Sequence, residues 1–156
     1  MCSSFVNGLN WLGGRRSNIE WISAVKRYGE PTGMTIAILD GPPAPPSVGA
    51  TIFHGVYAGP LPRHAKDSPF ADWVHSGWRP QSVGHVAVVL RVGAPRINLG
   101  EIATGPIKAV IDGLWPLLGG SAGRGEDWRI WALRLERGAP EVPADGIAVT
   151  VGQYAG

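Results

Sequence analysis

The stretch Glu101–Leu114, EIATGPIKAVIDGL, combines a helical pattern with a concentrated group of charges. Thr104 is a residue type that caps helices, and Pro106 fits the first turn, where a missing N–H costs nothing. Lys108 and Asp112 are four residues apart, so they lie one turn apart on a shared side. Apolar residues recur at the spacing of one buried face: Ile107, Val110, Ile111 and Leu114. The stretch predicts a loop running into an amphipathic helix that continues to about residue 118.

Strand patterns lie on both sides of this helix. His85–Val92 is an almost continuous apolar run, as in a central strand buried on both faces. Thr51–Tyr57, Trp128–Glu136 and Gly146–Val151 read as further strands, the last two with clear period-two alternation. A second helix is predicted after Ser68, which can cap it. The fold class is therefore α/β (α+β): a mixed β-sheet with helices packed on it.

The N-terminal part of the chain has a different pattern. Ser17–Glu20 reads as a capping box that opens a short helix, and Met34–Leu39 alternates as a strand. Residues 41–46, GPPAPP, have proline at four positions and predict an irregular or polyproline connection. Residues 1–33 are interpreted as an N-terminal helical extension before a main domain of residues 34–156. Their inclusion in the main domain is the alternative.

Composition limits the class of protein. The chain has 156 residues, 44% of them hydrophobic and 17% charged, with 23 Gly and 14 Pro, which favours one loop-rich globular domain. A net charge of +2 permits a nucleic-acid partner without requiring one. The single cysteine, Cys2, excludes an intrachain disulfide. Without a long apolar run or the order of a secretory signal, we expect a cytoplasmic protein with no membrane partner.

The order of these features carries a family resemblance. The strand from Met34 leads into Pro45-Pro46-Ser47, and the buried strand at 85–92 leads through a basic loop into IATGPIKAVIDGL. The acidic pair Glu126-Asp127 then precedes the strand IWALRLERG. This arrangement, up to Val151, resembles the RusA family of Holliday junction resolvases, which are small phage-derived endodeoxyribonucleases. The resemblance implies a RusA-like domain that acts on branched DNA.

The family's core pattern matches this chain in part. That pattern is Asp-x-Asp-Asn, a Lys three residues later, Asp-x-Leu four beyond the Lys, and an acidic pair before a strand. The positions that fit it are Lys108, Asp112, Leu114, Glu126 and Asp127. The chain departs from it at the two metal-binding aspartates, which fall on Ile102 and Thr104, and at the asparagine, which falls on Gly105. Glu101 is a nearby carboxylate, one residue out of register.

The resemblance implies Mg²⁺-dependent hydrolysis, which needs oxygen ligands that converge on the ion. The candidate metal ligands are Glu101, Asp112, Glu126 and Asp127. Lys108, Asp112 and Asp127 are the candidate catalytic residues, with Lys108 holding the scissile phosphate or stabilising developing charge. The alternative for Lys108 and Asp112 is an ordinary solvated helix pair, worth about 0.2–0.5 kcal/mol.

Basic and aromatic side chains supply a candidate DNA-binding surface. Its basic members are Arg63, His64, Lys66, Arg91, Arg96, Lys108, Arg124 and Arg129. Four tryptophans can either stack on bases or pack in the core or a dimer interface: Trp78, Trp115, Trp128 and Trp131.

Three functions remain open from the sequence. The first is a homodimeric RusA-like endonuclease that cuts branched DNA with Mg²⁺, its two-fold symmetry matching that of a four-way junction. The second is a module that kept this fold, lost the metal, and binds DNA or a protein without cutting. The third is an unrelated α/β enzyme in which the match to the motif is chance.

Overall fold

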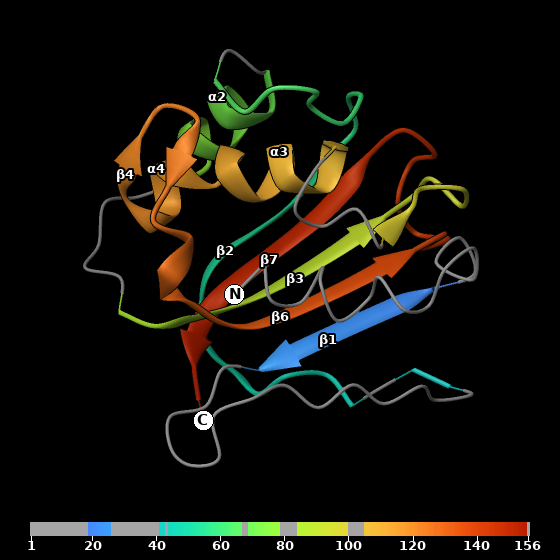
Figure 1. Ribbon diagram of the computed structural model, residues 1–156, viewed down its shortest axis with the longest axis horizontal. Coiled ribbons are helices and arrows are strands. Elements are labelled where there is room, and N and C mark those ends of the chain that lie inside the picture. The colour runs from blue at the N-terminus through green and yellow to red at the C-terminus, as the bar shows by residue number, and fades with distance from the viewer. Residues whose placement is uncertain are drawn as a thin grey trace.

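Five strands form one mixed sheet in the order β1-β6-β3-β7-β2 (Figure 1). The computed structural model describes residues 19–25, 41–42, 44–66, 69–78, 84–99 and 105–155. The strands are β1 (Trp21–Val25), β2 (Val48–Tyr57), β3 (Val86–Val92), β6 (Ile130–Arg137) and β7 (Ile147–Tyr154). β3 runs parallel to β6, and the other neighbouring strands are antiparallel. The mixed sheet with helices, and hence the α+β class, is confirmed.

Three helices and a small hairpin complete the described structure. The helices are α2 (Pro69–Ser76), α3 (Gly105–Gly113) and α4 (Trp115–Leu118). The hairpin consists of β4 (Gly120–Ser121) and β5 (Arg124–Gly125), and the 3-10 turn η3 (Asp127–Arg129) leads from it into β6. Figure 1 shows the helices and the hairpin gathered on the same side of the sheet.

The core lies between the helices and one face of the sheet. Alternate residues of β3 are fully buried: Val86, Val88, Leu90 and Val92. They share one hydrophobic cluster with residues of α3 such as Ile107 and Val110. The helices therefore cover the β3 face that carries the even-numbered residues, because successive strand side chains point to opposite faces.

The prediction of a helix after the Ser17–Glu20 capping box is wrong for residues 21–25, which form a strand. Trp21–Val25 is an edge strand, antiparallel to β6, with Ile22 opposite Leu135. Ile22 is buried in the core cluster, while Val25 is exposed. Packing against β6 thus overrides the local helical signal. This strand belongs to the sheet although it falls within the proposed extension, whose boundary at residue 33 stays a prediction.

The other local predictions have mixed outcomes. The strands predicted from Thr51, His85, Trp128 and Gly146 and the helix after Ser68 are confirmed. The central helix is interrupted at Leu114 because Pro116 has no N–H to bond to the carbonyl of Asp112. Residues 119–125 contain the β4–β5 hairpin. The strand predicted over 34–39 lies outside the described residues.

Ile22→Ala tests whether β1 is an integral part of the sheet. We expect it to lower the free energy of unfolding by about 2 kcal/mol, since a buried isoleucine side chain is truncated. Denaturant unfolding measures the change. Val25→Ala on the same strand is the matched control and should change stability by less than about 0.5 kcal/mol. Equal, small effects of both substitutions would contradict the packing of β1 on the core.

Candidate functional site

Three charged side chains predicted from the sequence meet beside α3. Lys108 forms an ion pair with Asp112, one helical turn further along. The Nζ atom of Lys108 also lies 3.9 Å from Oδ2 of Asp127, which begins η3. These side chains are only partly exposed, with 31% for Lys108, 21% for Asp112 and 46% for Asp127. Folding therefore brings two carboxylates from different elements to one lysine.

The packing of α3 and of the hairpin explains this meeting. α3 buries its apolar face in the core, which leaves Lys108 and Asp112 on its partly exposed side. The backbone N–H of Glu126 donates to the carbonyl of Gly119 at 3.0 Å and closes the base of the hairpin. A Cβ atom on Gly125 would lie 3.5 Å from the carbonyl oxygen of Asp112, so the hairpin lies directly against α3. Asp127, two residues later, is thereby held next to Lys108.

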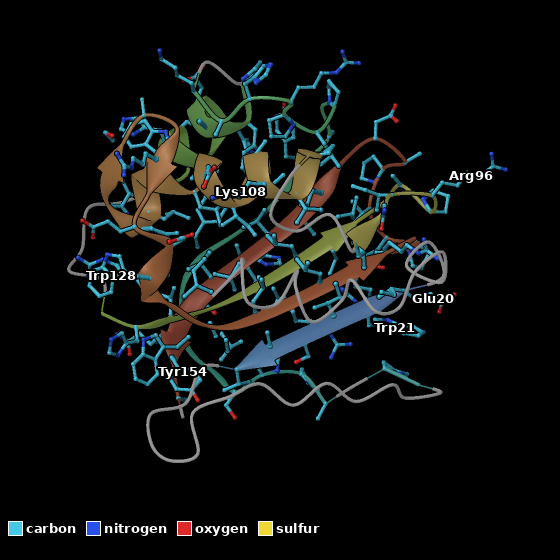
Figure 2. The ribbon with its side chains drawn as sticks, in the orientation of Figure 1. Glu20, Trp21, Arg96, Lys108, Trp128 and Tyr154 are labelled. Atoms are coloured by element: carbon cyan, nitrogen blue, oxygen red, sulfur yellow. The ribbon has the colours of Figure 1, made fainter. Side chains whose placement is uncertain are left out.

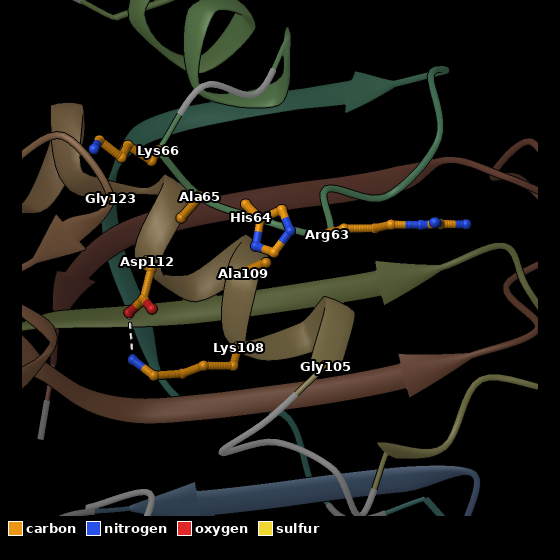
Figure 3. Close-up of a pocket in the computed structure, with 9 residues that line it drawn as sticks. All are labelled: Arg63, His64, Ala65, Lys66, Gly105, Lys108, Ala109, Asp112 and Gly123. Atoms are coloured by element: carbon orange, nitrogen blue, oxygen red, sulfur yellow. Dashed lines mark hydrogen bonds and ion pairs between the residues drawn. The ribbon is translucent and has the colours of Figure 1, made fainter.

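A cavity of about 330 Å³ opens beside this cluster (Figure 3). Its lining comes from the loop before α2, from α3 and from the tip of the hairpin. Four basic side chains line it, Arg63, His64, Lys66 and Lys108, against one carboxylate, Asp112. Figure 3 shows the Arg63 and Lys66 side chains extending away from Lys108 in different directions, so the surplus of positive charge surrounds the cavity, which favours an anionic partner.

Small residues that the sequence did not mark also shape the cavity. Ala65, Gly105, Ala109 and Gly123 line it between the basic groups. Gly123 has a φ of +74°, and a Cβ atom there would lie 3.0 Å from Cα of Lys66. The tip of the hairpin thus approaches the basic loop as closely as glycine allows. The glycine-rich stretch 119–125 was the available signal, but its contact with residue 66 depends on the tertiary fold.

The remaining basic residues predicted to bind DNA lie apart from this cavity or pair with acids. Arg91 points to the sheet face opposite the helices and pairs with Glu136 at 3.3 Å and with Glu141. Arg96 is exposed on the loop after β3, and Figure 2 shows it far from Lys108. Arg124 is exposed on β5. Of the basic candidates for DNA binding, the cavity is lined by Arg63, His64, Lys66 and Lys108.

One of the predicted metal ligands, Glu126, pairs with an arginine instead of joining the cluster. Oε2 of Glu126 accepts a hydrogen bond from Nε of Arg129 at 2.7 Å, within the same turn. Glu101 lies outside the described residues. No group of three or more His, Cys, Asp or Glu residues that could hold an ion is found in the described part of the chain.

Asp112 and Asp127 nevertheless suit Mg²⁺ by their chemistry. Mg²⁺ in phosphoryl-transfer sites is commonly held by one or two carboxylates together with substrate phosphates and water. These two carboxylates share Lys108, and Asp112 lines the cavity, so an ion held by them would lie beside a phosphate bound there. When bound, the ion would polarise the phosphate and lower the pKa of a bound water molecule.

The four candidate stacking tryptophans differ in exposure. Trp78 packs against the core cluster, and the Trp131 ring stacks on His85 with their centroids 3.9 Å apart. Trp115 is half-buried at the start of α4. Trp128 is 53% exposed. The structure thus retains Trp128 as the candidate for contact with a base.

Comparison of the chain with protein-family models, curated proteins and solved structures finds no match. Within the described residues, no helix combines the length and apolar character needed to cross a membrane.

Proposed function

We propose that this protein binds branched DNA through its backbone phosphates and cuts it by Mg²⁺-dependent hydrolysis, as a RusA-like homodimer. The observation that carries the proposal is the meeting of Lys108, Asp112 and Asp127 at the edge of a cationic cavity. These residues occupy the matching positions of the RusA pattern. They are separated in sequence, so local helix pairing alone does not account for the contact with Asp127.

Each part of the site has a distinct role in this proposal. Lys108 holds a backbone phosphate at the cavity, and Arg63 and Lys66, whose side chains extend away from Lys108 in Figure 3, attract neighbouring phosphates of the same DNA. Asp112 and Asp127 supply oxygen ligands to the ion, and Lys108 stabilises the charge that develops on the phosphate. Hydrolysis adds water across one P–O bond and leaves a phosphate monoester and a hydroxyl. The homodimer would place two such sites on opposite strands of a junction.

A second function has a specific observation in its favour. Ile102 and Thr104 stand where the RusA pattern has its two metal-binding aspartates. A protein with that change and an intact cationic cavity would bind the junction without cutting it. The two functions share the phosphate contact and differ only in the metal-dependent step.

A synthetic four-way junction separates these functions. The protein is incubated at low salt with the labelled junction, once with Mg²⁺ and once with EDTA, and the products are resolved on native and denaturing gels. Paired symmetric nicks that require Mg²⁺ support the nuclease. A band shift in both conditions without nicks supports the binding module. No shift in either condition would contradict both.

Lys66→Ala and Arg63→Ala test the phosphate contact itself. We expect each to weaken junction binding in EDTA about threefold and to lower the slope of log affinity against log salt by about one, because one phosphate contact is lost. Arg96→Ala is the charge-matched comparison and should change neither quantity, since Arg96 lies away from the cavity. An equal effect of all three substitutions would indicate general electrostatic attraction and contradict a defined site.

A further inference from the structure

Trp128 is the most exposed large apolar side chain that the described residues present, at 53% of its surface. A single exposed apolar residue is common on protein surfaces and needs a second observation before it indicates function. The surroundings of Trp128 provide that observation, because the guanidinium group of Arg129 packs on its ring and because Trp128 directly follows Asp127, a residue of the proposed site.

Glu126, Arg129 and Trp128 form a short chain of contacts within one turn. Oε2 of Glu126 accepts a hydrogen bond from Nε of Arg129 at 2.7 Å. The guanidinium carbon of Arg129 lies 4.6 Å from the centre of the Trp128 ring, in cation–π contact. Glu126 therefore fixes the guanidinium group, and the guanidinium group packs on the indole ring. Both orient the ring before any ligand arrives.

This turn joins the indole ring to the lysine–carboxylate cluster. Asp127, between Glu126 and Trp128, reaches to within 3.9 Å of Lys108. Figure 2 shows Trp128 at the edge of the molecule, with Lys108 between it and Arg96 in that view. Asp127 thus faces Lys108, whereas the adjacent Trp128 faces solvent.

The geometry points to Trp128 as a stacking surface for an unpaired nucleobase next to the phosphate held at Lys108; this inference rests on the proposed function. A flat, exposed indole next to a basic side chain is an arrangement with which proteins bind single-stranded nucleic acid. Every base offers a π-face, so stacking here selects unpaired nucleotides without selecting a sequence. In the open form of a four-way junction the base pairs at the branch point lack a stacked neighbour on one side, so they open more easily than pairs inside a duplex, which links this surface to junction recognition.

The same contacts give Glu126 a role other than metal ligation. Glu126 is a positioning residue: it holds Arg129, which in turn holds the Trp128 ring. The acidic pair that the sequence presents as two metal ligands thus divides into two functions. Asp127 serves the phosphate site, and Glu126 serves the base.

The test measures the coupling between Trp128 and an individual base. Full-length wild type, Trp128→Ala and Trp128→Phe are titrated in EDTA with junctions in which each nucleotide near the branch is replaced in turn by an abasic residue. For wild type we expect one or two abasic positions to lower affinity about tenfold. Trp128→Ala should bind the intact junction about tenfold more weakly and lose this discrimination, and Trp128→Phe should largely retain it. Glu126→Gln should reduce the discrimination about threefold.

Val56→Ala, which truncates another exposed apolar residue on β2, is the matched control and should behave as wild type. Fully paired duplex should bind Trp128→Ala and wild type equally. If the junction binds in a Lys108-dependent manner but no abasic position affects wild type and Trp128→Ala differently, the stacking surface is refuted and the proposed function stands. If no DNA binds at low salt, both are refuted.

Discussion

Lys108→Ala is expected to weaken binding of a four-way junction in EDTA about thirtyfold. The substitution removes a charge-assisted contact to phosphate, a class of interaction worth about 1.5–3 kcal/mol. It also leaves Asp112 and Asp127 next to the cavity without the cation that both now approach. Their uncompensated charge would repel the phosphate, so the loss should exceed that for Lys66→Ala. Fluorescence anisotropy with a labelled junction measures the affinity.

A double substitution separates these two causes. In Lys108→Ala/Asp112→Asn one of the repelling carboxylates is neutralised, and we expect binding to recover about threefold relative to Lys108→Ala. Lys108→Arg keeps the positive charge and should bind within about threefold of wild type. Lys108→Ala with the affinity of wild type would show that the cavity does not hold the phosphate.

The sheet was predictable from the sequence because its strands carry their own patterns. The apolar run of β3 and the alternation of β6 and β7 are visible in the sequence itself. A strand inside a packed sheet buries its apolar side chains whichever strands lie beside it. β1 was not predictable in the same way. The capping box at Ser17–Glu20 favours a helix over residues 21–25, whereas their observed conformation depends on the contact of Ile22 with the core and on the pairing with β6. An edge strand gains its stability from a partner far away in sequence.

The site was predictable in its charges and less so in its shape. The spacing of Lys108 and Asp112 fixes their contact on a helix, whereas the approach of Asp127 depends on how the β4–β5 hairpin packs against α3. The cavity depends further on Gly123 approaching Lys66. Glu126 and Asp127 meet different partners in the 3-10 turn, since Glu126 pairs with Arg129 and Asp127 approaches Lys108. A sequence shows two adjacent acids and does not show which partner each one meets.

Asp127→Asn is expected to lower Mg²⁺-dependent nicking of the junction at least a hundredfold. Asparagine retains the size of the side chain but loses the negative charge through which a carboxylate binds Mg²⁺ more strongly than an amide does. A loss of this size corresponds to about 3 kcal/mol of transition-state stabilisation. Single-turnover cleavage at saturating protein measures the chemical step without a contribution from binding.

The same substitution should strengthen binding in EDTA. Asp127 lies 3.9 Å from Lys108, so neutralising it removes a negative charge near the bound phosphate and leaves the lysine more available to it. We expect about a twofold to threefold gain in affinity, the range of an exposed charge pair. The control is Glu141→Gln, because Glu141 pairs with Arg91 away from the cavity. This substitution should alter neither cutting nor binding. Opposite changes in cutting and binding mark Asp127 as a metal ligand, because a carboxylate needed only for folding would weaken both when replaced. Junction binding without Mg²⁺-dependent nicks in wild type and in Asp127→Asn alike would instead assign the protein to the non-cutting class.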